Sequence, residues 1–125
     1  MKNRILFAED DPFNRLVFNA LLKNEPYEIT WVENGEAAID TFRNSSFDLA
    51  IIDIRMPLKD GFEVASFIRA QPGSDLPILA LTADNSPAEK RRCREAGMNA
   101  FLSKPVPGNQ LLEEINRLLV GSPSE

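Results

Sequence analysis

The 125-residue sequence contains no histidine and only one cysteine, Cys93. Without histidine, the chain cannot itself supply an imidazole as a general base, a metal ligand or a phosphorylated intermediate. A single cysteine cannot form an internal disulfide, which is typical of proteins from a reducing compartment. No apolar segment resembles a signal peptide or a membrane span, so a cytoplasmic location and no membrane insertion are expected.

The chain also lacks long blocks of like charge. Its 14 basic and 19 acidic residues give a net charge of −5 and are spread along the sequence. Direct binding to nucleic acid or to an anionic membrane through a basic surface is therefore disfavoured. The length suits one domain, predicted over 1–120, and the polar residues 121–125 are predicted to be a tail or the start of a linker.

Five short apolar runs alternate with segments of helical spacing. These runs are residues 4–8, 27–32, 47–53, 76–83 and 99–103. The third and fourth runs are apolar at successive positions, as in strands covered on both faces, whereas the second is more mixed and suits a sheet edge. This alternation predicts an α/β fold, a single doubly wound (βα)5 domain with a five-stranded parallel sheet.

Four of the helical segments have a clear apolar stripe. The stripes are Phe13, Leu16, Val17, Ala20 and Leu21; Ala38, Ile39 and Phe42; Val64, Ala65 and Ile68; and Leu111, Leu112, Ile115, Leu118 and Leu119. The segment 86–97 has the weakest pattern, with only Ala88, Cys93 and Ala96 for an inward face. A thinly packed helix of this kind is a candidate for movement.

Three consecutive carboxylates, Glu9, Asp10 and Asp11, follow the first apolar run. Such a cluster is often a solvated turn or a helix cap, and Asp11 before Pro12 is predicted to be an N-cap. Another acid, Asp53, lies at the end of the central strand, and ligands of parallel sheets bind beyond the carboxyl ends of strands. Glu9 and Asp10 are therefore expected to meet Asp53 there. Without a cation, at least one of these carboxylates is expected to have a raised pKa.

Two further polar residues, Thr82 and Lys104, fall at the ends of the fourth and fifth strands. Taken alone, Thr82 could be a strand former, Lys104 a solvated lysine and Asp53 a turn acid. Together they suit phosphate chemistry: carboxylate oxygens bind Mg²⁺, a hydroxyl and an ammonium bind phosphoryl oxygens, and an aspartate acts as nucleophile.

The segments AEDDP (8–12), IIDIRMPLKDGFE (51–63), ALTA (80–83) and AFLSKP (100–105) together resemble the motifs of response-regulator receiver domains of two-component phosphorelays. Asn14 and the segment AGMNAFLSKPV (96–106) resemble receivers attached to hybrid sensor histidine kinases. The resemblance spans the whole chain and implies the flavodoxin-like strand order 2-1-3-4-5.

The resemblance implies a role for each site residue. Asp53 would be the phosphoacceptor, and Mg²⁺, or Mn²⁺ in its place, would be bound directly by Asp10, Asp53 and the backbone carbonyl of Arg55, and by Glu9 through a metal-bound water. The phosphoryl oxygens would contact Thr82, Lys104 and the backbone N–H of Ala83. Thr82 and Phe101 would switch conformation, and the peptide bond before Pro105 would be cis.

The implied activity is Mg²⁺-dependent transfer of a phosphoryl group from a phosphohistidine donor, a histidine kinase or a histidine phosphotransfer protein. The domain would catalyse its own phosphorylation and dephosphorylation without being a kinase. Phosphorylation would change the face formed by residues 86–97, 99–103 and 111–119, where a protein partner would bind. The chain would be either a stand-alone protein or part of a hybrid histidine kinase.

Two alternatives belong to other classes. A phosphorylation-independent interaction module could keep the fold, although such modules usually lack an acid, the acceptor or the lysine. A haloacid-dehalogenase-like phosphatase would need a second acid two residues after Asp53, where Arg55 stands. We further hypothesise that Arg55 and Asp84 pair across the mouth of the site and slow hydrolysis of phosphorylated Asp53.

Overall fold

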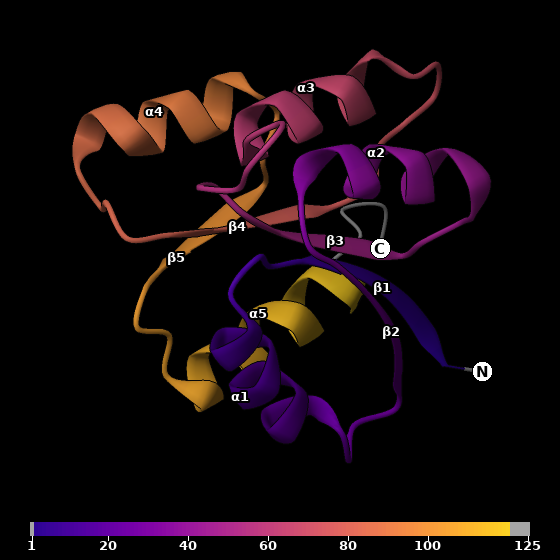
Figure 1. Ribbon diagram of the computed structural model, residues 1–125, viewed down its shortest axis with the longest axis vertical. Coiled ribbons are helices and arrows are strands. Elements are labelled where there is room, and N and C mark those ends of the chain that lie inside the picture. Colours follow the sequence, from indigo (N-terminus) through magenta and orange to yellow (C-terminus); the bar gives the residue numbers. More distant parts are fainter. Residues whose placement is uncertain (1, 121–125) are drawn as a thin grey trace.

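The computed structural model describes residues 2–120, so the tail predicted at 121–125 lies outside the described residues. Five parallel strands form one sheet in the order β2-β1-β3-β4-β5 (Figure 1). The strands are β1 (Asn3–Ala8), β2 (Tyr27–Val32), β3 (Leu49–Asp53), β4 (Ile78–Thr82) and β5 (Ala100–Ser103). The helices are α1 (Pro12–Leu22), α2 (Gly35–Asn44), α3 (Gly61–Ala70), α4 (Pro87–Glu95) and α5 (Gly108–Val120). The predicted fold class and strand order are confirmed.

The helices form a layer on each face of the sheet. Helices α1 and α5 cover one face, and α2, α3 and α4 cover the other (Figure 1). Strands β3 and β4 are buried at every position, whereas β2 is an edge strand with partly exposed residues, as predicted. Each face has its own apolar core. Because both faces of the sheet are covered by apolar cores, a polar site is expected where the strands end.

None of the helices within residues 2–120 is long and apolar enough to cross a membrane.

The predicted inward face of α1 is wrong. Four of its five residues are exposed: Phe13 (69%), Leu16 (67%), Val17 (41%) and Ala20. The buried residues are Phe18 and Leu22, which pack in the core that α1 shares with α5. Apolar residues occur around most of this helix, so spacing alone does not identify the buried side. An apolar surface consequently remains exposed on α1.

The predicted inward faces of α2, α3 and α5 are confirmed, because their stripe residues are buried or packed against a core. The inward face of α4 differs at one position. Ala88 is exposed, and the adjacent Glu89 is buried instead, together with Cys93. Ala96 packs against the core from just beyond the helix. The first turn of α4 therefore buries the carboxylate of Glu89 and not the methyl group of Ala88.

Two local features position the ends of β1 and β3. The Asp11 side chain accepts a hydrogen bond from the Phe13 N–H at 2.9 Å and is the N-cap of α1, as predicted. Gly61 begins α3 directly against the end of β3, where a Cβ atom would lie 2.8 Å from the carbonyl oxygen of Asp53. A larger residue at Gly61 would therefore displace the backbone that carries Asp53.

Candidate functional site

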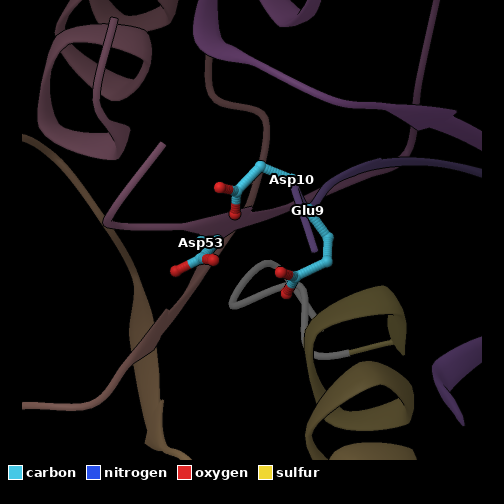
Figure 2. Close-up of side chains that lie close together, drawn as sticks. All are labelled: Glu9, Asp10 and Asp53. Atoms are coloured by element: carbon cyan, nitrogen blue, oxygen red, sulfur yellow. The ribbon is translucent and has the colours of Figure 1, made fainter. Parts of the chain in front are cut away.

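Three carboxylates gather at the carboxyl ends of β1 and β3. Figure 2 shows the side chains of Glu9, Asp10 and Asp53, and one oxygen of each lies within 4.8 Å of the others. The end of β1 lies beside the end of β3 because Ala8 pairs with Ile52 in the sheet. Glu9 and Asp53 are buried, whereas Asp10 is exposed. The structure thus brings the three acids predicted from the sequence together.

The Glu9 carboxylate is 0% exposed and is held from two sides. Its Oε1 atom lies 3.2 Å from Lys104 Nζ, and its Oε2 atom accepts the backbone N–H of Asp11 at 3.2 Å. Burial and then the charge of Asp53 raise the pKa of Glu9, and the contacts with Lys104 and Asp11 only partly oppose this. The predicted raised pKa is confirmed, although burial is a larger cause than repulsion between carboxylates.

Lys104 connects the fifth strand to this cluster. Its Nζ atom lies 2.9 Å from Asp53 Oδ2, in addition to its contact with Glu9. Burial alone would lower the pKa of Lys104, but the hydrogen bond and charge of Asp53, followed by those of Glu9, outweigh burial and raise it. The Lys104–Pro105 peptide bond is cis, as predicted. Lys104 is therefore a protonated counter-charge for two buried acids.

Thr82 ends β4 and is buried, with 1% of its surface exposed. Its Oγ1 atom lies 2.9 Å from Glu89 Oε2 and accepts the backbone N–H of Asp84 at 3.0 Å. Ala83 follows it and is exposed. Phe101 lies on the neighbouring strand β5, is half-buried and packs against the core on the α2, α3 and α4 side. The structure places Thr82 and Phe101 in adjacent strands.

The donor set fits a small divalent cation. Carboxylate oxygens are the ligands that Mg²⁺ prefers, and Mg²⁺ typically takes one or two carboxylates and keeps waters that a phosphate can replace. Glu9 and Asp53 supply buried oxygens, and the exposed Asp10 lies on the solvent side. The backbone carbonyl of Arg55 is two residues beyond Asp53, in the loop that follows β3. These four residues are the ones that would hold the ion.

Comparison with known proteins identifies the family. The profile described as the response regulator receiver domain matches residues 5–116. The chain belongs to the response regulator receiver domain family. Its relatives include the sensor protein GacS of Pseudomonas syringae pv. syringae, 37% identical over 116 residues, and the sensory/regulatory protein RpfC of Xanthomonas campestris pv. campestris, 32% identical over 122 residues.

The receiver spans only a small part of these relatives. The match with GacS covers 90% of this chain and 13% of GacS, and the match with RpfC covers 95% of this chain and 17% of RpfC. Both relatives are sensory proteins much longer than the receiver.

Solved structures of receivers have the same fold. The receiver domain of the sensor histidine kinase PA1611 from Pseudomonas aeruginosa PAO1 is 34% identical, with a TM-score of 0.88 over 98% of this chain and 100% of that chain. That structure has a magnesium ion coordinated in its active-site cleft. The Vibrio cholerae chemotaxis protein CheY4 is 29% identical, with a TM-score of 0.89 over 95% of this chain and 100% of that chain.

The predicted pair of Arg55 with Asp84 is wrong. The Arg55 guanidinium lies 3.3 Å from both carboxylate oxygens of Glu89, and within residues 2–120 its ion pair is made there. The Asp84 carboxylate instead accepts the backbone N–H of Ser86 at 2.8 Å. This bond is the main reason that the pKa of Asp84 is lowered, while the nearby Arg55 charge contributes less. The buried Glu89 carboxylate attracts Arg55 more strongly than the exposed Asp84 carboxylate does, because water does not solvate the Glu89 charge.

Glu89 is the residue of the site that the sequence did not reveal. Its side chain is 4% exposed and contacts both Thr82 and Arg55. The pattern Ser86-Pro-Ala-Glu89 predicts a capping box, in which the glutamate would bind the N-cap backbone. The Ser86 hydroxyl does cap the Glu89 N–H at 3.2 Å, but the Glu89 carboxylate points inward. No sequence signal distinguishes these two orientations.

Proposed function

We propose that this receiver accepts a phosphoryl group on Asp53 from a phosphohistidine donor and loses it again by hydrolysis. The observation that carries the proposal is that a buried aspartate at the end of β3 lies beside two further acids that follow β1 and a protonated lysine that follows β5. The fold does not require a buried aspartate to lie beside two acids and a lysine, whereas phosphoryl transfer requires a nucleophile and positive charge around it.

In this proposal a carboxylate oxygen of Asp53 attacks the phosphorus in line, and the bond between phosphorus and the donor imidazole nitrogen breaks. The imidazole leaves with the electron pair of that bond. Bound Mg²⁺ would supply positive charge to the phosphoryl oxygens. Lys104, already 2.9 Å from Asp53, would bind a phosphoryl oxygen, and Thr82 and the Ala83 N–H would bind others. Attack of water on the acyl phosphate restores the carboxylate and releases inorganic phosphate.

Phosphorylation is proposed to change the face formed by α4, β5 and α5. Adding negative charge at Asp53 would draw the Thr82 hydroxyl toward the site and let Phe101 move. The partial burial of Phe101 and the thin packing of α4, which buries only Glu89 and Cys93, support this part of the proposal. A protein partner would then distinguish the two states of this face.

The exposed apolar surface of α1 is proposed as the docking surface for the donor protein. The helix begins two residues after Asp10, and Phe13 and Leu16 in its first two turns are exposed. A donor that brings its imidazole to Asp53 must cover the surroundings of the acids, and large exposed apolar residues are the usual anchors of such contacts. A small phosphodonor would not need this surface.

The proposal is tested by incubating the protein with Mg²⁺ and acetyl phosphate and measuring its intact mass. One phosphoryl group should be added, should be stable in acid and labile in base, and should be absent when Mg²⁺ is chelated. Asp53→Asn should abolish the adduct, whereas Asp75→Asn, a change of an exposed aspartate before β4, should not. Absence of any adduct on the unaltered protein would favour the phosphorylation-independent interaction module.

A further inference from the structure

We propose that Glu89 is a positioning residue that holds the Thr82 hydroxyl in the unphosphorylated receiver and releases it when Asp53 is phosphorylated. The inference rests on the proposed function of Asp53. Glu89 lies in the first turn of α4, and its side chain is only 4% exposed. Carboxylates are rarely buried unless specific partners hold them, so the contacts of Glu89 indicate its role.

The existing contacts of the Thr82 hydroxyl already use its only proton. Its Oγ1 atom lies 2.9 Å from Glu89 Oε2 and 3.1 Å from the carbonyl oxygen of Asp84. A threonine hydroxyl has one proton, and the carboxylate is both the nearer and the charged acceptor. If the proton turned to Asp84, lone pairs of the hydroxyl would face the Glu89 carboxylate. Thr82 must therefore leave Glu89 before it can donate to a phosphoryl oxygen.

A comparison of two helices shows that the inward orientation of Glu89 is not required by capping. Glu63 in α3 and Glu89 in α4 occupy the same position, the third after the N-cap. The Glu63 carboxylate accepts the N–H of its N-cap, Asp60, at 2.9 Å and completes a capping box. In α4 the N-cap N–H of Ser86 is satisfied by Asp84 instead. The Glu89 carboxylate is thus free of the cap and available to the switch residue.

Release of the Thr82 hydroxyl would change the contacts of the first turn of α4. The Arg55 guanidinium, 3.3 Å from both carboxylate oxygens, would remain as the counter-charge of Glu89 and could draw it toward solvent. The next residue, Lys90, places Nζ 5.6 Å from the centroid of the Phe101 ring. Consecutive residues of one helical turn therefore contact both predicted switch residues. Apart from Glu89, only Cys93 of α4 is buried, so little apolar packing opposes a shift of this turn.

Glu89→Gln tests the role of the charge. Glutamine keeps the shape of the side chain, but a neutral acceptor makes a hydrogen bond roughly half as strong as a charged one. The hydroxyl is then free more often, and a ligand that needs it binds more tightly in proportion to the free fraction. With Mg²⁺ present, beryllofluoride, a stable mimic of a phosphoryl group on aspartate, should bind the variant roughly fivefold more tightly by calorimetry.

The matched control is Glu63→Gln, which removes a first-turn glutamate charge that serves only its own cap. It should bind beryllofluoride as the unaltered protein does. In a Thr82→Ala background, Glu89→Gln should cause no further change in beryllofluoride binding. If Glu89 had a merely structural role, its replacement would still change binding in that background. Equal or weaker binding by Glu89→Gln, or tighter binding that persists without the Thr82 hydroxyl, would overturn the proposal.

The unaltered protein provides a second test that needs no variant to fold. Addition of Mg²⁺ and beryllofluoride should shift both the Glu89 carboxyl ¹³C signal and the Thr82 methyl signal in NMR spectra. If beryllofluoride binds and these signals do not move, the positioning role is wrong while the role of Asp53 stands. If it does not bind and acetyl phosphate leaves no adduct, the proposed function fails and this inference fails with it.

Discussion

Replacing Lys104 by methionine should destabilise the metal-free receiver far more than removing a surface lysine would. The ammonium lies 2.9 Å from Asp53 Oδ2 and 3.2 Å from Glu9 Oε1, and these two side chains are 6% and 0% exposed. Methionine has a similar length but no charge. The substitution therefore leaves two buried carboxylates facing each other without their counter-charge.

The expected loss follows from these contacts. Two unit charges about 3 Å apart attract by about 5.5 kcal/mol at an effective dielectric constant of about 20. Burial of the ammonium offsets part of this attraction, and removing one partner of a buried pair typically costs about 3–5 kcal/mol. In a domain of this length, that loss lowers the unfolding temperature by about 11–19 °C, given the usual unfolding entropy per residue.

Urea unfolding monitored through Trp31 measures this loss. Trp31 is the only tryptophan and stacks on Phe7 in the core, with ring centroids 4.4 Å apart, so its fluorescence reports unfolding. The control is Lys23→Met at an exposed lysine, which should change the free energy of unfolding by less than about 0.5 kcal/mol. Mg²⁺ should restore part of the loss, because it binds the folded state and supplies positive charge. A difference between Lys104→Met and the control below about 1 kcal/mol, typical of a solvated pair, would refute the reasoning.

Three further predictions concern other parts of the receiver. Asp10→Asn should weaken Mg²⁺ binding in calorimetry by about tenfold or more, whereas Asp11→Asn should change it little because asparagine caps a helix equally well; equal effects would contradict this division. Phe13→Ser and Leu16→Ser should slow phosphoryl transfer from a phosphorylated donor protein without slowing labelling by acetyl phosphate, and equal slowing of both would exclude α1 as the docking surface. Burial, and then Glu89, raises the pKa of the Cys93 thiol above 9.0, so the associated stabilisation is present below pH 9.0 and is lost as the pH rises through the folded-state pKa. Iodoacetamide at pH 9 should therefore alkylate Cys93 much more slowly in the native protein than in urea, and equal rates would contradict its burial.

Much of the fold could be predicted because the strongest signals were local. The continuous apolar runs at β3 and β4 correspond to strands that are buried at every position. The acids and the lysine could be placed together because parallel strands bring their carboxyl ends to one edge of the sheet. The contacts of Lys104 with Glu9 and Asp53 are the outcome of that topology.

The errors arose where tertiary packing decides between options that are locally equivalent. Helix α1 has apolar residues on two sides, and the sheet buries Phe18 and Leu22 rather than Phe13 and Leu16. In α4, the sequence could not show that Asp84 would satisfy the N-cap and leave Glu89 free to turn inward. The buried side of α1 is decided by packing against the sheet and α5, and in α4 Ser86 can be capped by either Asp84 or Glu89, so periodicity and capping patterns alone cannot determine these outcomes.

Borohydride trapping of the labelled residue tests the role of Asp53 most directly. Borohydride reduces an acyl phosphate of aspartate to homoserine, and peptide mass spectrometry then locates the change. After incubation with Mg²⁺ and acetyl phosphate, the account predicts homoserine at position 53 alone, in the peptide that follows the buried β3 strand. Homoserine at position 10, at another acid, or at no position in the labelled protein would contradict it.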